Sequence, residues 1–174
     1  WQSYTWSDYL ERVRCFSLGL LALGLERGET VAIVGDNRPE WVIGQLAAIS
    51  AGGVSMGIYQ DCVASEVQFL AHFADATFLV AEDQEQVDKY LEVRDGLPKI
   101  RRVIFYDQRG MRGYDDDVLM EFSEVEKIGA QLGAQKSGLF ESTVDSLKAE
   151  DVALFATTSG TTGNPKGVLY SHRA

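Results

Sequence analysis

The sequence is poor in cysteine and in long apolar runs, and both shortages narrow the class of protein. Cys15 and Cys62 are its two cysteines, and neither has the spacing of a metal site, which predicts buried, free thiols in a reducing compartment. The most apolar run covers ten residues, 16–25, whereas a transmembrane helix needs about twenty. We therefore expect no signal peptide, no transmembrane helix and a cytoplasmic location.

Basic residues are also scarce. Lysine and arginine number 16 against 26 aspartates and glutamates, and the net charge is −10. A surface of that charge repels the phosphate backbone of DNA or RNA, so no nucleic acid partner is expected. Any phosphate-binding site must therefore be local.

The residues that are present are typical of a globular protein. Hydrophobic residues make up 45% and charged residues 24% of the 174 residues, enough for one domain with a proper core. The sequence starts at Trp1 rather than at Met, and Tyr4 and Trp6 follow closely. We interpret it as a piece of a longer chain.

Short apolar runs alternate with helical patterns through the first 106 residues. Continuous apolar runs predict strands, and apolar residues at helical spacing between capping and glycine signals predict helices. This alternation predicts the α/β class, a doubly wound, mostly parallel sheet with right-handed crossovers and helices on both faces. We expect strands at 31–35, 54–59, 77–81 and 102–106, and helices at about 6–23, 39–52, 65–74 and 84–94.

Three of the predicted helices have recognisable starts. Residues 5–8 (Thr-Trp-Ser-Asp) and 65–68 (Ser-Glu-Val-Gln) have the spacing of capping boxes. Asn37 is placed to cap the helix whose first turn contains Pro39. In the first helix, the apolar face begins at Trp6, and we expect that face to lie against the core.

The segment at 107–149 breaks the alternation. It is polar and punctuated by glycine, so we expect an exposed, irregular segment with one helix through about 122–132. Its acidic run, residues 115–117, could be proposed as a metal site. We favour a solvated loop and expect no metal site, because no strand end holds the three carboxylates in place.

The last part of the sequence has the composition of a phosphate-binding loop. A short apolar strand, residues 152–156, precedes a run of glycines and small hydroxyl residues that ends in Pro165-Lys166-Gly167. Glycine lets backbone N–H groups turn inward, hydroxyls add donors, and lysine adds a positive charge. It is not a Walker loop, because Pro165 stands at the second glycine position. A dinucleotide fingerprint is also absent after Gly35.

The order of residues in this loop resembles a known signature. The run Thr157-Thr158-Ser159-Gly160-Thr161-Thr162-Gly163-Asn164-Pro165-Lys166-Gly167 is similar to the phosphate-binding signature of the adenylate-forming superfamily. Residues 31–41 (VAIVGDNRPEW) and 51–59 (AGGVSMGIY) resemble the N-terminal part of bacterial long-chain fatty acid CoA ligases. The resemblance covers essentially the whole sequence. It implies that residues 1–174 are the truncated N-terminal α/β part of a larger adenylate-forming domain, with its phosphate loop at 157–167.

The resemblance also implies a two-step reaction. A fatty carboxylate attacks the α-phosphorus of MgATP to give an acyl-adenylate and pyrophosphate, and coenzyme A then displaces AMP to give the thioester. ATP, Mg²⁺ and coenzyme A are the implied cofactors of the full-length enzyme, and the fatty acid is its substrate. The implied phosphate-binding residues are Thr157, Thr158, Ser159, Gly160, Thr161, Thr162, Gly163, Pro165, Lys166 and Gly167.

The roles within this set differ. Lys166 would add charge, Pro165 would restrict the exit of the loop, and Gly167 would allow close packing beneath it. Family members place their adenine, ribose and magnesium residues and their adenylation lysine downstream of the signature. No catalytic residue is therefore expected within residues 1–174, and this piece alone is expected to be inactive.

Two other functions stay open. A ligase of the same superfamily could act on another carboxylic acid, and a non-enzymatic module could bind a nucleotide or phosphate. The loop could also be a flexible linker, with Lys166 as a solvated surface residue. Peripheral membrane association through regions beyond these residues is left open. Self-association is expected, because cutting a chain through its core exposes apolar surface.

Other polar residues have simpler interpretations. His172 could act as a general base, but Ser171 beside it is placed to cap a following helix, and His72 is interpreted as structural or exposed. The group formed by Asn37, Arg38 and Glu40 follows the carboxyl end of a strand, where α/β proteins bind ligands. We favour capping and salt-bridge roles for these three residues.

Overall fold

A computed structural model describes residues 3–158 and 165–174 of the chain. Within these residues the strands form one sheet in the order β5-β4-β3-β1-β2-β6-β7. Neighbouring strands are parallel, except that β7 runs antiparallel to β6. The prediction of an α/β fold with a mostly parallel sheet is confirmed. The strands are β1 (Thr30–Val34), β2 (Val54–Ile58), β3 (Ala76–Ala81), β4 (Arg102–Phe105), β5 (Leu119–Glu121), β6 (Val152–Thr158) and β7 (Lys166–Ser171).

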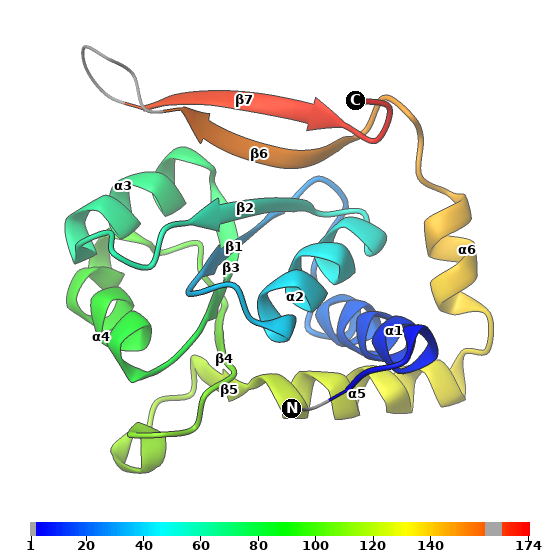
Figure 1. Cartoon of the computed structure of the whole chain (residues 1–174), viewed down its shortest axis with the longest axis horizontal. Coiled ribbons are helices and arrows are strands. Elements are labelled where there is room, and N and C mark those ends of the chain that lie inside the picture. The colour runs from blue at the N-terminus through cyan, green and yellow to red at the C-terminus, as the bar shows by residue number, and fades with distance from the viewer. Residues whose placement is uncertain (1–2, 159–164) are drawn as a thin grey trace.

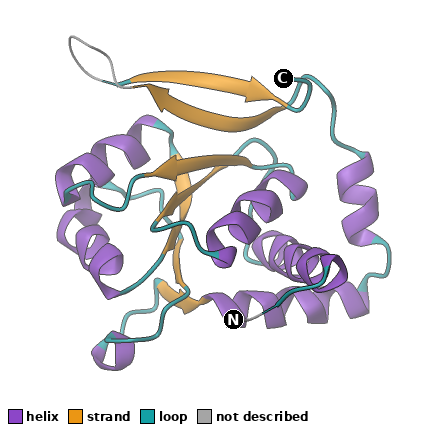
Figure 2. Cartoon of the chain, in the orientation of Figure 1, coloured by secondary structure: helices purple, strands orange, loops and turns teal. Residues whose placement is uncertain are grey.

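Helices cover both faces of the sheet, as Figures 1 and 2 show. On one face, α3 and α4 pack on one set of strand side chains, and on the other face α1, α2 and α5 pack on the alternate set. The doubly wound arrangement is confirmed. The helices are α1 (Trp6–Ala22), α2 (Pro39–Ser50), α3 (Ala64–Phe73), α4 (Gln84–Val93), α5 (Phe122–Gln135) and α6 (Leu139–Asp145), with 3₁₀ turns at Arg94–Gly96 and Met111–Gly113.

The two central strands explain why continuous apolar runs predict this sheet. Every residue of β1 and of β3 is buried. Successive side chains of a strand point to opposite faces, so a strand covered on both sides needs apolar residues at every position. Val31 and Ile33 therefore belong to the core under α1 and α2, whereas Ala32 and Val34 belong to the core under α3 and α4.

The helix starts agree with the sequence in one case of three. Thr5 caps α1 in a reciprocal capping box with Asp8, as predicted. The box predicted at 65–68 is wrong: α3 starts earlier, after Val63, whose backbone N–H donates to the Glu66 carboxylate at 3.0 Å. The Asn37 cap is also wrong, because Arg38 is the last extended residue before α2 and provides no side-chain cap.

The first turns of α1 do not reach the core. Trp6 is 86% exposed and Leu10 is 51% exposed, whereas Val13 and Phe16 are buried. The buried residues of α1 lie in its second half, from Val13 to Leu20. The expectation that the apolar face begins at Trp6 is therefore wrong by two turns.

The segment at 107–149 is more regular than expected. Its strand β5 pairs with β4 in parallel, with Leu119 opposite Val103, and its helix α5 buries Phe122 and Val125. A second helix, α6, leads toward β6 along the side of the molecule (Figure 1). Apart from one 3₁₀ turn, the stretch before β5 is irregular, and there Asp116 accepts hydrogen bonds from Arg94 at 2.5 Å and from the Val118 N–H at 3.1 Å.

The structure also bears on the cysteines and on the expected absence of a membrane helix. Cys15 and Cys62 are free and half-buried rather than fully buried. Among the described residues, no helix combines the length and the apolar character that a bilayer crossing requires.

Candidate functional site

The phosphate signature spans a β-hairpin at one side of the sheet. The strand β6 ends at Thr158, β7 begins at Lys166, and these two residues lie opposite each other in the antiparallel pair. The Thr158 hydroxyl donates to the Lys166 carbonyl oxygen at 3.4 Å. Ser159, Gly160, Thr161, Thr162 and Gly163 lie outside the described residues, so their predicted contacts with phosphate stay predictions.

The hairpin presents the signature at the carboxyl edge of the sheet. Since β6 is parallel to β2, its carboxyl end lies on the same edge as those of β1, β2 and β3. Figure 1 shows β6 and β2 pointing in the same direction, toward the end of the β6–β7 pair at which β6 stops and β7 starts. Ligands of open α/β sheets bind outside this edge.

The described signature residues lie together but on opposite faces of the hairpin. Thr157 is paired with Gly167, and Thr158 is paired with Lys166. Because side chains alternate along a strand, the first pair shares the face of Phe155, which contacts Phe73 of α3. Thr158 and Lys166 project from the other face, and both are exposed. The structure leaves Lys166 free to face solvent or an anion, and its charge role stays a prediction.

A cavity of about 580 Å³ adjoins the hairpin on the side of α2. Its walls come from the turn after β1, the start of α2, the loop after β2, and residues 154–157 of β6. Gly57 allows the Trp41 ring to pack closely against β2 in the cavity wall, because a Cβ on Gly57 would lie 3.0 Å from Cζ2 of Trp41. Thr157 lines the cavity, so the signature and the turn after β1 border one space.

The direction in which the chain adds strands reverses between β1 and β3, and the turn after β1 also borders this cavity. From β1 the chain moves to β2 on one side, and from β2 it returns past β1 to β3 on the other side. The helix after β1, α2, and the helix after β3, α4, therefore cover opposite faces. A crevice between the carboxyl ends of two such strands is the usual ligand position in doubly wound sheets.

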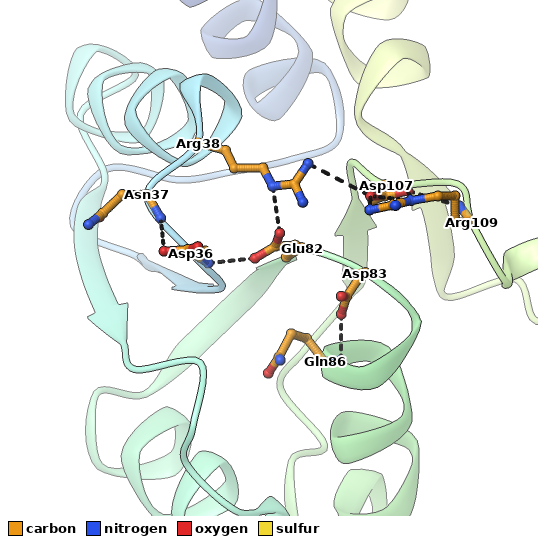
Figure 3. A network of polar contacts seen from close by, with 8 residues as sticks. All are labelled: Asp36, Asn37, Arg38, Glu82, Asp83, Gln86, Asp107 and Arg109. Carbon is orange, nitrogen blue, oxygen red and sulfur yellow. Dashed lines mark hydrogen bonds and ion pairs between the residues drawn. The ribbon is translucent and has the colours of Figure 1, made fainter.

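Charged residues meet at this reversal, as Figure 3 shows. Glu82, directly after β3, is 5% exposed. Its carboxylate accepts a hydrogen bond from the Asp36 N–H at 2.5 Å and pairs with Nε of Arg38 at 2.6 Å. The salt-bridge interpretation of Arg38 is confirmed. Glu40 likewise pairs with Arg12, at 3.1 Å.

The network continues to the residues after β4. Asp107 lies 3.8 Å from Arg38 and accepts hydrogen bonds from the N–H and Nε of Arg109 at 3.0 and 2.9 Å. The Arg109 hydrogen bonds, with help from the charge of Arg38, lower the pKa of Asp107 to about 2. This carboxylate is therefore ionised at any physiological pH.

The phenol of Tyr106 lies beneath the network. Burial raises its pKa, and the negative charge of Glu82 raises it further, so the phenol stays protonated. Its hydroxyl is buried and has no hydrogen-bond partner among the described residues. Neither Tyr106 nor Glu82 was expected as part of a site. The one signal in the sequence that could have indicated Glu82 is its position directly after a buried apolar strand.

The two histidines do not join this site in the structure. His72 is exposed near the end of α3. His172 lies in the turn after β7, and its backbone N–H donates to the Asp151 carbonyl oxygen at 3.0 Å. Ser171 is the last residue of β7, and the Ala174 N–H donates to its carbonyl oxygen at 3.1 Å; its role as the cap of a following helix stays a prediction.

Comparison with known proteins shows the family. Residues 1–174 match the family described as AMP-binding enzyme. The chain belongs to the AMP-binding enzyme family. Its geometry agrees with membership, since the signature hairpin lies at the ligand-binding edge of the sheet. Membership also confirms the expected kinship with adenylate-forming acyl-CoA ligases.

Relatives of this AMP-binding chain are much longer than the chain itself. It is 33% identical over 172 residues to long-chain-fatty-acid–CoA ligase ACSBG2 of Xenopus laevis, covering 99% of the chain and 23% of that protein. It is 32% identical over 171 residues to long-chain-fatty-acid–CoA ligase ACSBG1 of Rattus norvegicus, covering 98% of the chain and 23% of that protein. The chain thus spans about a quarter of the relatives that it matches.

The fold is also found among solved structures. Acetoacetyl-CoA synthetase from Streptomyces lividans superposes with a TM-score of 0.80 at 23% identity, over 98% of this chain and 26% of that one. The anthranilate CoA ligase AuaEII superposes with a TM-score of 0.77 at 20% identity, over 99% and 30%. At these identities the likeness concerns the fold.

Proposed function

We propose that this chain is the N-terminal part of an ATP-dependent long-chain fatty acyl-CoA synthetase. The observation that carries the proposal is the position of the signature hairpin. It lies where β6 ends, at the carboxyl edge of the sheet, and its residue Thr157 lines a cavity there. Relatives over the whole chain are named long-chain-fatty-acid–CoA ligases. The reaction joins a fatty acid to CoA through an acyl-adenylate and releases AMP and pyrophosphate.

The role proposed for the hairpin is to hold the phosphates that leave as pyrophosphate. Hydroxyls and backbone N–H groups aimed at developing negative charge stabilise the transition state. The described residues suit that role: Thr158 and Lys166 are exposed at the base of the loop, and a lysine there adds a positive charge. When bound, Mg²⁺ would neutralise phosphate charge. Its ligands are proposed to lie beyond residue 174.

Activity is proposed only for the full-length protein. The chain spans 23% of the length of its relatives, so residues beyond 174 are available to hold adenine, ribose and CoA. Residues 1–174 alone are therefore proposed to be inactive. Cytoplasmic location, self-association and membrane association stay predictions.

The test replaces one hydroxyl of the loop in the full-length enzyme. The Thr161→Val variant keeps the volume of the side chain and removes its hydrogen bond. If that bond serves a desolvated phosphate, ATP–pyrophosphate exchange should fall about fivefold to a hundredfold, which corresponds to about 1 to 3 kcal/mol.

A matched control makes the same change in a structural helix. The hydroxyl of Thr143 in α6 donates to the Leu139 carbonyl oxygen at 2.7 Å, and Figure 1 shows α6 beside the opposite end of the β6–β7 pair from the carboxyl end of β6. Thr143→Val should therefore keep normal exchange. If a folded Thr161→Val enzyme carries out ATP–pyrophosphate exchange at the wild-type rate, the phosphate-binding role proposed for the loop is contradicted.

A ligase for another carboxylic acid is the second candidate. The solved structures of similar fold include an acetoacetyl-CoA synthetase and an anthranilate CoA ligase. Thioester formation by the full-length enzyme with palmitate, an aryl acid and an amino acid separates the candidates. Preference for palmitate supports the first proposal, and preference for either of the others supports the second.

A further inference from the structure

Glu82 is a buried charged residue to which the proposed function gives no part. It is 5% exposed, and both of its carboxylate oxygens are occupied. One oxygen accepts from the Asp36 N–H at 2.5 Å and the other pairs with Nε of Arg38 at 2.6 Å. Since a buried carboxylate is costly unless it is paired and hydrogen-bonded, these contacts tie the end of β3 firmly to the turn after β1.

The turn after β1, residues 35–38, is also restricted sterically. Gly35 has φ of 148°, which favours glycine. A Cβ there would lie 2.6 Å from Cβ of Glu82 and 2.5 Å from the Tyr106 hydroxyl. The backbone of the turn is thus packed against Glu82 and Tyr106 on one side and hydrogen-bonded to Glu82 at the next residue. Its position depends directly on Glu82.

The other side of the same turn lines the cavity beside the signature hairpin. Asp36 and Asn37 both border that cavity, as does Thr157. The Asp36 carboxylate accepts from the Asn37 N–H at 2.8 Å, and the exposed Asn37 carboxamide is the uncharged polar side chain of the turn at this cavity. Figure 3 shows this carboxamide pointing away from Glu82. Its side chain forms no hydrogen bond with the described residues.

A carboxamide in this position suits a ligand rich in both donors and acceptors. It offers two N–H donors and one carbonyl acceptor, and Gln45 of α2 adds a second carboxamide to the same cavity. Adenine edges and ribose hydroxyls are groups that such side chains bind. The nearby half-buried indole of Trp41 supplies an apolar wall.

We propose that Glu82 is a positioning residue that fixes the turn at 35–38, so that the Asn37 carboxamide hydrogen-bonds an adenine nucleotide in this cavity. This proposal rests on the proposed function, in which ATP and CoA are the two adenine nucleotides. Glu82 does not touch the ligand. It acts through the Asp36 N–H and the Arg38 side chain, and Asn37 makes the contact.

A purely structural Glu82 would behave differently, and the chain offers a matched control. Glu29, directly before β1, pairs with Arg101 at 2.6 Å and accepts the Glu26 N–H at 2.8 Å. It thus repeats the combination of one arginine and one backbone N–H at the opposite edge of the sheet. Both Glu82→Gln and Glu29→Gln replace a carboxylate acceptor by a carboxamide, and both should lower the melting temperature.

The experiment measures steady-state KM for ATP and for CoA in the full-length enzyme. Glu82→Gln and Asn37→Ala should each raise the KM of the same nucleotide about fivefold, the effect of losing one hydrogen bond. Glu29→Gln should leave both KM values at wild type. The nucleotide whose KM rises identifies whether ATP or CoA occupies the cavity. Asn37 is exposed, so its variant tests the proposal even if Glu82→Gln fails to fold.

Two results would overturn the proposal. One is a folded Asn37→Ala enzyme with both KM values unchanged. The other is a Glu82→Gln enzyme that loses melting temperature and kcat as Glu29→Gln does, without any change in KM. A wild-type enzyme that forms no thioester from ATP, CoA and an acid would instead refute the proposed function, so the two failures are distinct.

Discussion

The ring of Phe155 lies against Gly167 at the base of the signature hairpin, so close that a Cβ on Gly167 would be 2.5 Å from Cζ of the ring. The two residues share one face of the β6–β7 pair, where Phe155 also contacts Phe73 of α3, with ring centroids 5.5 Å apart. The expectation that Gly167 allows close packing is confirmed. Its neighbour is an aromatic ring of the sheet itself.

The first prediction concerns this contact. Gly167→Ala should push the Phe155 ring from its position and lower the free energy of unfolding by about 1 to 3 kcal/mol. In the full-length enzyme it should also reduce ATP–pyrophosphate exchange, because Gly167 directly follows Lys166, the first residue of β7 after the loop. Urea unfolding and the exchange assay measure the two effects.

A second substitution tests the cause. Phe155→Leu should relieve the clash, so the double variant should lose less stability than the two single losses add up to. Gly113→Ala is the control, because a Cβ there meets nothing within 4 Å. Equal stability of Gly167→Ala and wild type would contradict the steric account.

The sheet was predictable because its central strands are buried on both faces. In a chain that alternates strands with helices, a continuous apolar run such as that of β1 or β3 is best interpreted as a buried parallel strand. By contrast, β5 has three residues, fewer than a periodic pattern needs. Its pairing with β4 is a tertiary choice, and no local signal reports it.

The candidate site also has one part that the sequence predicts and one part that it does not. Glycines, small hydroxyls and a lysine in one loop announce phosphate binding, because the chemistry is local. The contact between Glu82 and Asp36 joins residues 46 positions apart, and either residue alone is an ordinary acid after a strand.

The start of α3 is a third case, in which the sequence favours the wrong residue. Val63 precedes the helix, and its N–H donates to Glu66, although Ser65 has the side chain that usually caps a helix.

The second prediction concerns the close crossing of α1 and α5. A Cβ on Gly129 would lie 1.7 Å from the Cys15 carbonyl oxygen and 2.5 Å from the Gly19 nitrogen. Both obstacles are backbone atoms, so the helices would have to separate. Gly129→Ala should therefore lower the free energy of unfolding by about 3 kcal/mol, at the upper end for overpacking. Thermal and urea unfolding measure it.

Gly133 of the same helix provides the comparison. A Cβ there meets only Cδ1 of Leu18, at 3.0 Å, and a side-chain methyl group can shift. Alanine also favours the helix over glycine by about 1 kcal/mol. Gly133→Ala should thus be nearly neutral or stabilising. Similar losses for the two variants would show that the crossing is not tightly packed.

The third prediction follows from the low pKa of Asp107, which the Arg109 hydrogen bonds hold at about 2. A carboxyl group whose pKa is lower in the folded than in the unfolded chain stabilises the fold above the unfolded value, about 4. That stabilisation is lost as the pH falls from about 4 to about 2. The stability difference between wild type and Asp107→Asn should be constant above pH 4 and shrink below it.

Arg109→Ala supplies the second arm of that experiment. Without the guanidinium, the Asp107 pKa should rise toward its ordinary value, so the carboxylate should contribute less at every pH. Chemical unfolding from pH 6 to pH 2 records all three proteins. A stability difference that stays constant through this range would contradict the lowered pKa.

The last prediction concerns the reactivity of Cys15. Burial raises the pKa of this thiol to about 11, and the Glu11 carboxylate, which accepts its S–H at 3.4 Å, adds to the effect. At pH 8 only about one thiol in a thousand is then ionised, and the thiolate is the reactive form. Iodoacetamide should alkylate Cys15 in the folded protein far more slowly than in the urea-unfolded chain, as followed by peptide mass spectrometry. Glu11→Gln should speed the reaction in the folded protein only, and equal rates with and without urea would show that the thiol is neither shielded nor held protonated by its surroundings.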